Sequence, residues 1–161
     1  MYYSSFLMFN IVLYQPEIPP NTGNIVRLCA NTGASLHLIE PLGFHLTDKH
    51  FKRAGLDYNA AMVLKRYCSF DAYLENYKDS SIYLCTTKAE NSYTSISFKP
   101  GDTLVFGPET RGLPNQILTS FPESQKIKIP MQANSRSLNL SNAVSIILYE
   151  ALRQQSFLGL R

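Results

Sequence analysis

The sequence lacks the residue patterns that mark several common classes of protein. It contains no Gly-x-Gly, so the dinucleotide-binding fingerprint is absent, and no Gly-x-Ser-x-Gly or His-Glu-x-x-His, which removes support for a serine hydrolase or a metalloprotease. The segment from Gly107 to Gly112 has the glycine spacing of a P-loop, but Leu113 follows where that loop requires lysine. These absences exclude the P-loop NTPases and leave the hydrolase interpretations without a motif.

Cysteines are few and long apolar runs are absent. The three cysteines, Cys29, Cys68 and Cys85, form no Cys-x-x-Cys pair and no cluster with histidine, so we expect no zinc site and reduced thiols. No apolar run approaches the roughly 20 residues that span a membrane. Residues 1–9 are too short and too polar for a signal peptide. We therefore expect a cytoplasmic protein with no membrane partner.

The charge and the length are ordinary. The formal net charge is +3, which is compatible with an RNA partner without indicating one, because proteins that hold a long nucleic acid often have a larger basic excess. A chain of 161 residues, 45% of them hydrophobic, is long enough to bury one substantial core. We expect a single domain over residues 1–161.

Short apolar runs alternate with helical patterns along the chain. We predict strands over 9–14, 35–40, 62–67, 81–86, 103–106 and 126–129, and helices over 21–30, 48–54, 70–77, 114–120 and from 141 or 142 to about 155. Asn21 or Thr22 should cap the first helix and Gly33 should end it. Ser141 or Asn142 should cap the last. This alternation predicts an α/β fold, with a mostly parallel sheet flanked by helices and ligands bound where the strands end.

Three polar loops follow predicted strands, at 21–27, 104–114 and 129–144. The first begins a helix whose backbone N–H groups can hold an anion, although a capped helix with a surface arginine is the simpler interpretation. The second has glycine at the end of a strand, where a ligand can approach the backbone, and a rigid turn with a surface ion pair is about equally consistent. The third contains more asparagine and serine than helix capping requires.

Together these loops resemble the three motifs of the SPOUT superfamily of methyltransferases, and in particular its TrmH-like branch of ribose 2′-O-methyltransferases. The matching residues are Asn-x-Gly-Asn-x-x-Arg at 21–27, Phe-Gly-Pro-Glu-x-x-Gly-Leu at 106–113, and Ile-Pro-Met with Ser-Leu-Asn-Leu-Ser at 129–131 and 137–141. With the opening segment 10–23, the chain resembles the short members that methylate nucleotide 34 of tRNA. The resemblance begins at Met8, so residues 1–7 are expected to be an extension outside the family pattern.

The resemblance implies a SPOUT fold with a deep C-terminal trefoil knot, which general rules of chain topology would not suggest. It implies S-adenosyl-L-methionine as methyl donor, bound bent within the knotted loops and released as S-adenosyl-L-homocysteine, with no metal. By position, the residues expected at the cofactor are Cys85, Gly107, Ile129, Ser137 and Leu138. The family acts as a homodimer, and we expect the apolar stripe of the last helix to contribute to the interface, through Val144, Ile147, Leu148, Ala151 and Leu152.

The resemblance also implies roles for polar residues. Arg27 matches the essential arginine of the family, and because a guanidinium stays charged we expect it to orient the ribose hydroxyl and an adjacent phosphate. Proton acceptance by Arg27, activated by that phosphate, is the alternative. The other catalytic positions match Asn21, Glu109, Ser137 and Asn139, which are expected to fix loop geometry and substrate pose. RNA contacts are expected from Arg27, Arg136, Arg111 and Tyr149, with Arg153 a further candidate; solvated arginines and a packed tyrosine are the ordinary alternatives.

The expected substrate is therefore the anticodon loop of tRNA. Nucleotide 34, a cytidine or a carboxymethylaminomethyl-uridine of leucine isoacceptors, would receive the methyl group on its 2′-hydroxyl. A ribose methyltransferase for another tRNA or rRNA position is the alternative among enzymes, although larger relatives carry an RNA-binding extension that this chain lacks. A catalytically silent RNA-binding protein is the alternative of another class, and the matched catalytic residues argue against it.

Overall fold

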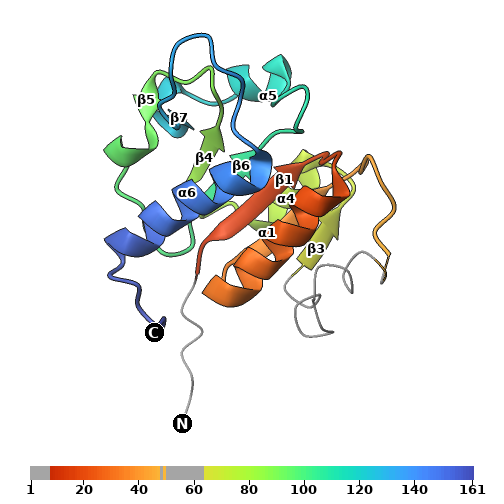
Figure 1. Cartoon of the computed structure of the whole chain (residues 1–161), viewed down its shortest axis with the longest axis horizontal. Coiled ribbons are helices and arrows are strands. Elements are labelled where there is room, and N and C mark those ends of the chain that lie inside the picture. Colours follow the sequence, from red (N-terminus) through yellow and green to blue (C-terminus); the bar gives the residue numbers. More distant parts are fainter. Residues whose placement is uncertain (1–7, 48, 50–63) are drawn as a thin grey trace.

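A seven-stranded parallel sheet forms the centre of the part of the chain that the computed structural model describes, residues 8–47, 49 and 64–161 (Figure 1). The strand order is β3-β2-β1-β6-β4-β7-β5, and each neighbouring pair is parallel. The strands are β1 (Asn10–Tyr14), β2 (Ser35–Ile39), β3 (Leu64–Tyr67), β4 (Ile82–Cys85), β5 (Asn91–Ser92), β6 (Thr103–Phe106) and β7 (Lys126–Lys128). The predicted α/β class with a parallel sheet is confirmed.

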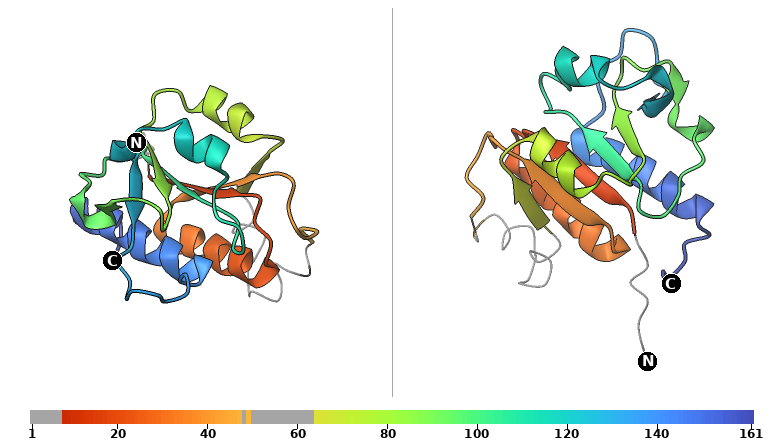
Figure 2. Two further views of the ribbon diagram at one scale, coloured as in Figure 1. Left: turned by 90° about the horizontal axis from the view of Figure 1, so that it is seen from above. Right: turned by 180° about the vertical axis from the view of Figure 1, so that it is seen from behind.

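Helices cover both faces of this sheet. Figure 2 shows α1 (Pro19–Thr32) and α6 (Leu140–Gln154) on one face, and α4 (Phe70–Asn76) and α5 (Asn115–Thr119) on the other. The central strands β1 and β6 are therefore buried on both sides, which explains why their sequences are apolar runs without alternation. The predicted helix over 48–54 lies outside the described residues except for residue 49, and the beginning of the strand predicted over 62–67 lies outside them too.

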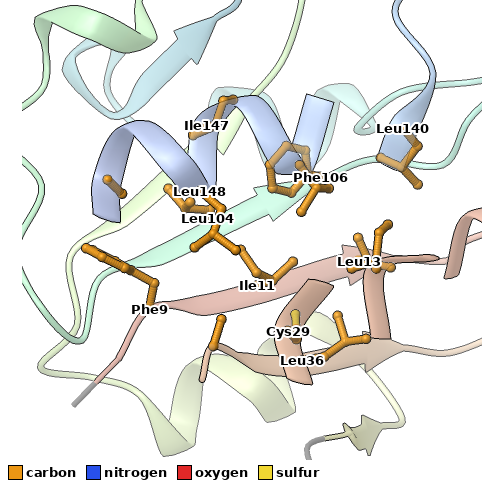
Figure 3. Close-up of a cluster of buried hydrophobic side chains, with 14 of the residues drawn as sticks. Phe9, Ile11, Leu13, Cys29, Leu36, Leu104, Phe106, Leu140, Ile147 and Leu148 are labelled. Carbon is orange, nitrogen blue, oxygen red and sulfur yellow. The ribbon is translucent and has the colours of Figure 1, made fainter. Parts of the chain in front are cut away.

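The larger hydrophobic core lies between the sheet and the pair α1 and α6 (Figure 3). Ile11 and Leu104 of the two central strands meet Leu148 of α6 there, and each is fully buried. The apolar stripe of α6 belongs to this core, since its residues are at most 2% exposed: Val144, Ile147, Leu148, Ala151 and Leu152. The prediction that this stripe contributes to a subunit interface is wrong, because the chain's own core already covers it.

The first helix begins earlier than predicted. Pro19 and Pro20 occupy its first positions, where a missing N–H costs nothing because the helix has no acceptor for it there. The N-cap is Ile18, whose side chain makes no capping hydrogen bond, so the prediction of a cap at Asn21 or Thr22 is wrong. The predicted end is confirmed: Gly33 adopts a left-handed conformation with φ of 77° and donates its N–H to the Cys29 carbonyl.

The last helix also begins earlier than predicted, because Asn139 is its N-cap. The Asn139 side-chain oxygen accepts hydrogen bonds from the backbone N–H of Ser141 at 2.9 Å and of Asn142 at 3.3 Å. The prediction of a cap at Ser141 or Asn142 is wrong for this reason. None of the described helices has both the length and the apolar character needed to cross a membrane.

A buried histidine lies in the β2 strand. His37 is fully buried, and its Nε2 lies 2.9 Å from the side-chain oxygen of Asn10, whose amide nitrogen donates to the Gly101 carbonyl. Asn10 therefore accepts from His37, which places the imidazole proton on Nε2. Burial, and to a lesser extent the charge of Lys65, lowers the pKa of His37 to about 4. Three tyrosine rings surround the imidazole: Tyr67, Tyr73 and Tyr77.

We predict that the free energy of unfolding falls as the pH drops from about 6.5 to about 4. In this window the unfolded chain binds a proton at His37 and the folded chain does not, so stability is complete above the window and decreases by about 3 kcal/mol through it. Urea unfolding at a series of pH values measures the slope of the free energy of unfolding against pH. His37→Gln should flatten it, whereas His45→Gln, at an exposed position, should leave it unchanged. An unchanged slope in His37→Gln would contradict the assignment.

Candidate functional site

A cavity of about 430 Å³ lies at the carboxyl ends of β4 and β6, next to the beginnings of α1 and α6. A smaller apolar extension of about 80 Å³ adjoins it and shares part of its wall. Small-molecule sites typically occupy roughly 300–1,000 Å³, so the larger cavity alone suits a small ligand. This is the edge at which ligands bind in parallel sheets.

The structure brings all five residues predicted at the cofactor to this cavity. Cys85, Ser137 and Leu138 line both parts, Gly107 lines the larger part, and Ile129 lines the smaller one. Desolvation raises the pKa of the Cys85 thiol above its ordinary value, so this side chain is a neutral wall of the cavity and not a thiolate nucleophile. The extension is otherwise mostly apolar, which suits a flat aromatic ring more than a charged group.

Glu109 joins the loop after β6 to the beginning of α1. Its carboxylate accepts the backbone N–H of Glu17 at 2.7 Å and that of Ile18 at 3.1 Å, and the side-chain amide of Asn21 at 3.4 Å. These donors lie just before the helix and in its first turn, where negative charge is stabilised by the helix dipole. Glu109 thus takes the place of the local cap that Ile18 cannot provide.

The Glu17 carboxylate in turn binds the loop that carries Glu109. Its carboxylate accepts the backbone N–H of Thr110 at 3.0 Å and the Thr110 hydroxyl at 2.8 Å, and Arg111 approaches it at 3.8 Å. Hydrogen bonds from the Thr110 backbone and hydroxyl lower the pKa of Glu17, and the charge of Arg111 adds to the effect. The two glutamates therefore form a reciprocal pair, each holding the segment that carries the other.

The third segment is attached to the first through asparagine. The Asn139 amide nitrogen donates to the Asn21 side-chain oxygen at 2.9 Å, while the Asn139 oxygen caps α6. Asn21 in turn donates to Glu109. The motif residues Asn21, Glu109 and Asn139, which are predicted to be catalytic, are thus connected in one hydrogen-bonded series. Ser137 is exposed, lines the cavity, and has no hydrogen-bond partner among the described residues.

Neighbouring backbone atoms leave no room for a side chain at position 107, so glycine is required there. A Cβ at this position would lie closer than 3.0 Å to backbone atoms of Gly112 and Leu113, because the loop folds back on the end of β6. Gly112 adopts a positive φ of 66° and donates its N–H to the Pro108 carbonyl at 2.9 Å. The loop's own backbone therefore requires glycine at this position, while the approach of a ligand to Gly107 stays a prediction.

The residues predicted to contact RNA do not all lie at the cavity, unlike those predicted to contact the cofactor. Arg111 lines the cavity, and its side chain is 59% exposed and pairs with Glu17. Arg27 and Arg136 are exposed but line neither part of the cavity. Tyr149 is 45% exposed on the outer side of α6, where it contacts the Phe157 ring. Arg153, on the same helix, pairs with Glu150 at 2.8 Å.

Sequence reasoning missed part of the cavity wall. Thr86, Thr87 and Lys88 follow β4 and line the larger cavity, and Glu17 was not among the candidates although it holds the β6 loop. The position of a polar Thr-Thr-Lys sequence directly after a buried strand was the available signal for the first three. The described residues contain no group of three or more histidine, cysteine or acidic side chains that could hold a metal ion.

A model of the SpoU rRNA Methylase family matches residues 8–149. The chain belongs to this family. Two relatives of the chain are tRNA (cytidine(34)-2′-O)-methyltransferases, from Aeromonas hydrophila and Escherichia coli K12. Each is 55% identical over 152 residues, which cover 94% of this chain and 97% of the relative.

Solved structures with a similar fold are also found. One, described as giving structural insights into the 2-OH methylation of C/U34 on tRNA, is 45% identical, has a TM-score of 0.86, and covers 96% of this chain and 99% of its own. A SpoU methyltransferase from Streptomyces viridochromogenes, solved in complex with AdoMet, is 24% identical with a TM-score of 0.78, over 94% of this chain and 62% of that one. The second likeness concerns the fold alone.

Glu109→Ala should lower the free energy of unfolding by about 2 kcal/mol, because two backbone N–H groups lose a charged acceptor at partly exposed positions. Thermal and urea unfolding measure the effect. Glu75→Ala removes an exposed carboxylate from α4 and serves as the matched control, with an expected change below about 0.5 kcal/mol. Equal stability of the two variants would contradict the capping role.

Gly107→Ala should destabilise the chain by about 3 kcal/mol, because the new methyl group displaces the backbone at Gly112 and Leu113. Gly112→Ala places its methyl group in open space and bears only the cost of a positive φ, about 1 kcal/mol. Urea unfolding of both variants tests the order. A smaller loss in Gly107→Ala than in Gly112→Ala would show that the loop adapts to a side chain there.

Proposed function

We propose that the chain transfers a methyl group from S-adenosyl-L-methionine to the 2′-hydroxyl of nucleotide 34 in the anticodon loop of tRNA. The observation that carries the proposal is the convergence of the three motif segments on one cavity, where Glu109, Asn21 and Asn139 bond them together. Relatives 55% identical over 94% of the chain bear the name of this activity.

The cofactor would occupy the cavity and its apolar extension. We propose that the adenine ring lies in the extension between Ile129 and Leu138, and that the ribose and amino-acid end reach the polar part near Gly107 and Ser137. Two further apolar residues of the extension, Phe106 and Ile147, strengthen this orientation. The AdoMet complex of a SpoU methyltransferase supports the choice of cofactor for the family.

Methyl transfer from a sulfonium is an in-line displacement in which the ribose oxygen attacks the methyl carbon and the thioether leaves. The protein's task is to position the hydroxyl and assist the loss of its proton. Glu109, Asn21 and Asn139 are engaged with one another and with backbone, so they hold the loops in place. Ser137, whose hydroxyl has no partner among the described residues, is free to contact ligand.

Arg27 is proposed as the residue that orients the ribose hydroxyl and an adjacent phosphate. It lies on the exposed side of α1, about 9 Å along the axis from Asn21 at about 1.5 Å per residue. A guanidinium keeps its charge and donates several hydrogen bonds in one plane, which suits a phosphate better than it suits proton abstraction. Arg136 and Arg111 are proposed as further phosphate contacts, and Tyr149 as an RNA contact.

We further infer a homodimer. Apolar side chains lie exposed along the outer side of α6 and the tail that follows it, and exposed patches of this kind indicate association. They are 36–58% exposed: Ile146, Tyr149, Phe157 and Leu158. This surface replaces the buried stripe as the proposed interface. A second subunit placed there would also add a second set of the arginines proposed to contact RNA.

The remaining proposals follow from membership of the family. Residues 1–161 are inferred to form one domain, with 1–7 preceding the family match that starts at residue 8. The trefoil knot is proposed for the C-terminal part, and β6 lying between β1 and β4, with α6 returning to α1, is compatible with it. We propose a cytoplasmic location and leucine tRNA isoacceptors as substrates.

Arg27→Ala should lower methyl transfer at least about 100-fold, because the hydroxyl loses the group that orients it. The assay uses labelled S-adenosyl-L-methionine with tRNA that lacks the modification, and mass spectrometry locates the product. Arg161→Ala removes the same charge from the exposed C-terminal residue and should retain full activity. A 2′-O-methyl group at another position would favour the alternative substrate, and no transfer by the wild type, despite cofactor binding, would favour the silent RNA-binding protein.

A further inference from the structure

We propose that Lys88 binds the carboxylate at the amino-acid end of S-adenosyl-L-methionine. The inference rests on the proposed function, because it assumes that this cofactor occupies the cavity. Lys88 lies outside the three motif segments and follows β4 by three residues.

Lys88 stands on the wall of the larger cavity and at its mouth. It lines that part together with Thr86 and Thr87, and its side chain is exposed. Its backbone N–H donates to the Thr86 hydroxyl at 3.2 Å, which closes a short turn at the end of β4. The turn fixes the lysine backbone relative to the sheet, while the side chain is free to follow a ligand.

The charged residues around this cavity differ in whether they have a partner within the protein. Three charged residues line the larger part: Lys88, Glu109 and Arg111. Glu109 accepts three hydrogen bonds from α1 and the residues before it, and Arg111 pairs with Glu17. Among the described residues, Lys88 has no carboxylate within ion-pair distance. It is therefore the cation on this wall whose charge the protein does not already balance.

The cofactor presents one group that matches this charge. S-adenosyl-L-methionine carries a positive sulfonium, a positive ammonium and a negative carboxylate at neutral pH, so only the carboxylate is attracted to a lysine. With adenine in the apolar extension, the amino-acid end extends into the larger, more polar part, which Lys88 lines. A lysine is a compact charge on a flexible stem and suits a carboxylate whose position is set by the rest of the ligand.

The test compares two ligands that differ in the amino-acid end. Calorimetry measures the affinity of the wild type and of Lys88→Gln for S-adenosyl-L-homocysteine and for 5′-methylthioadenosine, which has no carboxylate. We expect Lys88→Gln to weaken S-adenosyl-L-homocysteine about tenfold and to change 5′-methylthioadenosine less than about twofold. Lys88→Arg should recover most of the affinity because it keeps the charge.

Lys128→Gln is the matched control, since Lys128 lines the apolar extension where the carboxylate should not lie. It should not discriminate between the two ligands, and thermal unfolding confirms that each variant folds. Equal weakening of both ligands by Lys88→Gln, or no weakening of either, overturns the proposal. A higher KM for tRNA with unchanged S-adenosyl-L-homocysteine affinity also overturns it and makes Lys88 a phosphate contact. A wild type that binds neither ligand would instead overturn the proposed function.

Discussion

The carboxylate of Glu109 is the contact on which the arrangement of the site depends. It accepts hydrogen bonds from residues about ninety positions earlier in the chain, at the beginning of α1, and Asn21 extends the series to Asn139 and α6. The parallel sheet brings the ends of β1, β4 and β6 to one edge, but the sheet alone does not fix the loops beyond it. One series of partly buried hydrogen bonds does so, and the cavity takes its shape from these fixed loops.

Much of the fold could be predicted because it depends on local patterns. The strand over 103–106 has the predicted bounds, and the apolar stripe predicted in α6 is present, although it packs in the chain's own core and not in a subunit interface. The helix starts could not be predicted in the same way. Asn21 looks like a cap in sequence, but its side chain bonds to Glu109 and Asn139, and Ile18 becomes the N-cap because a distant carboxylate serves the beginning of the helix. The strand order, with β6 between β1 and β4, is likewise a property of tertiary structure.

The candidate site, like the fold, could be predicted only in part from the sequence. The five cofactor candidates lie around one cavity because they sit at strand ends and in one loop, which motif resemblance can identify; their role stays a prediction. Resemblance gave no position for Arg27 relative to that cavity, and the described chain leaves it on the exposed side of α1. Lys88 and Glu17 escaped the sequence analysis because a lysine after a strand and a glutamate beside prolines are common on surfaces. Their roles become apparent only when the structure shows which neighbouring charged residues already have hydrogen-bond or ion-pair partners.

The reciprocal pairing of Glu17 and Glu109 bears on how fast a ligand can enter and leave. A loop tethered to α1 through both carboxylates, and folded tightly on itself at Gly107, has little freedom to swing outward as a gate. We therefore expect ligand exchange at this cavity to need no slow opening of the loop, unlike the step that limits turnover in many enzymes. The residence time of a ligand would then depend on the strength of its own contacts with the cavity. A by-product that binds tightly would therefore slow repeated turnover.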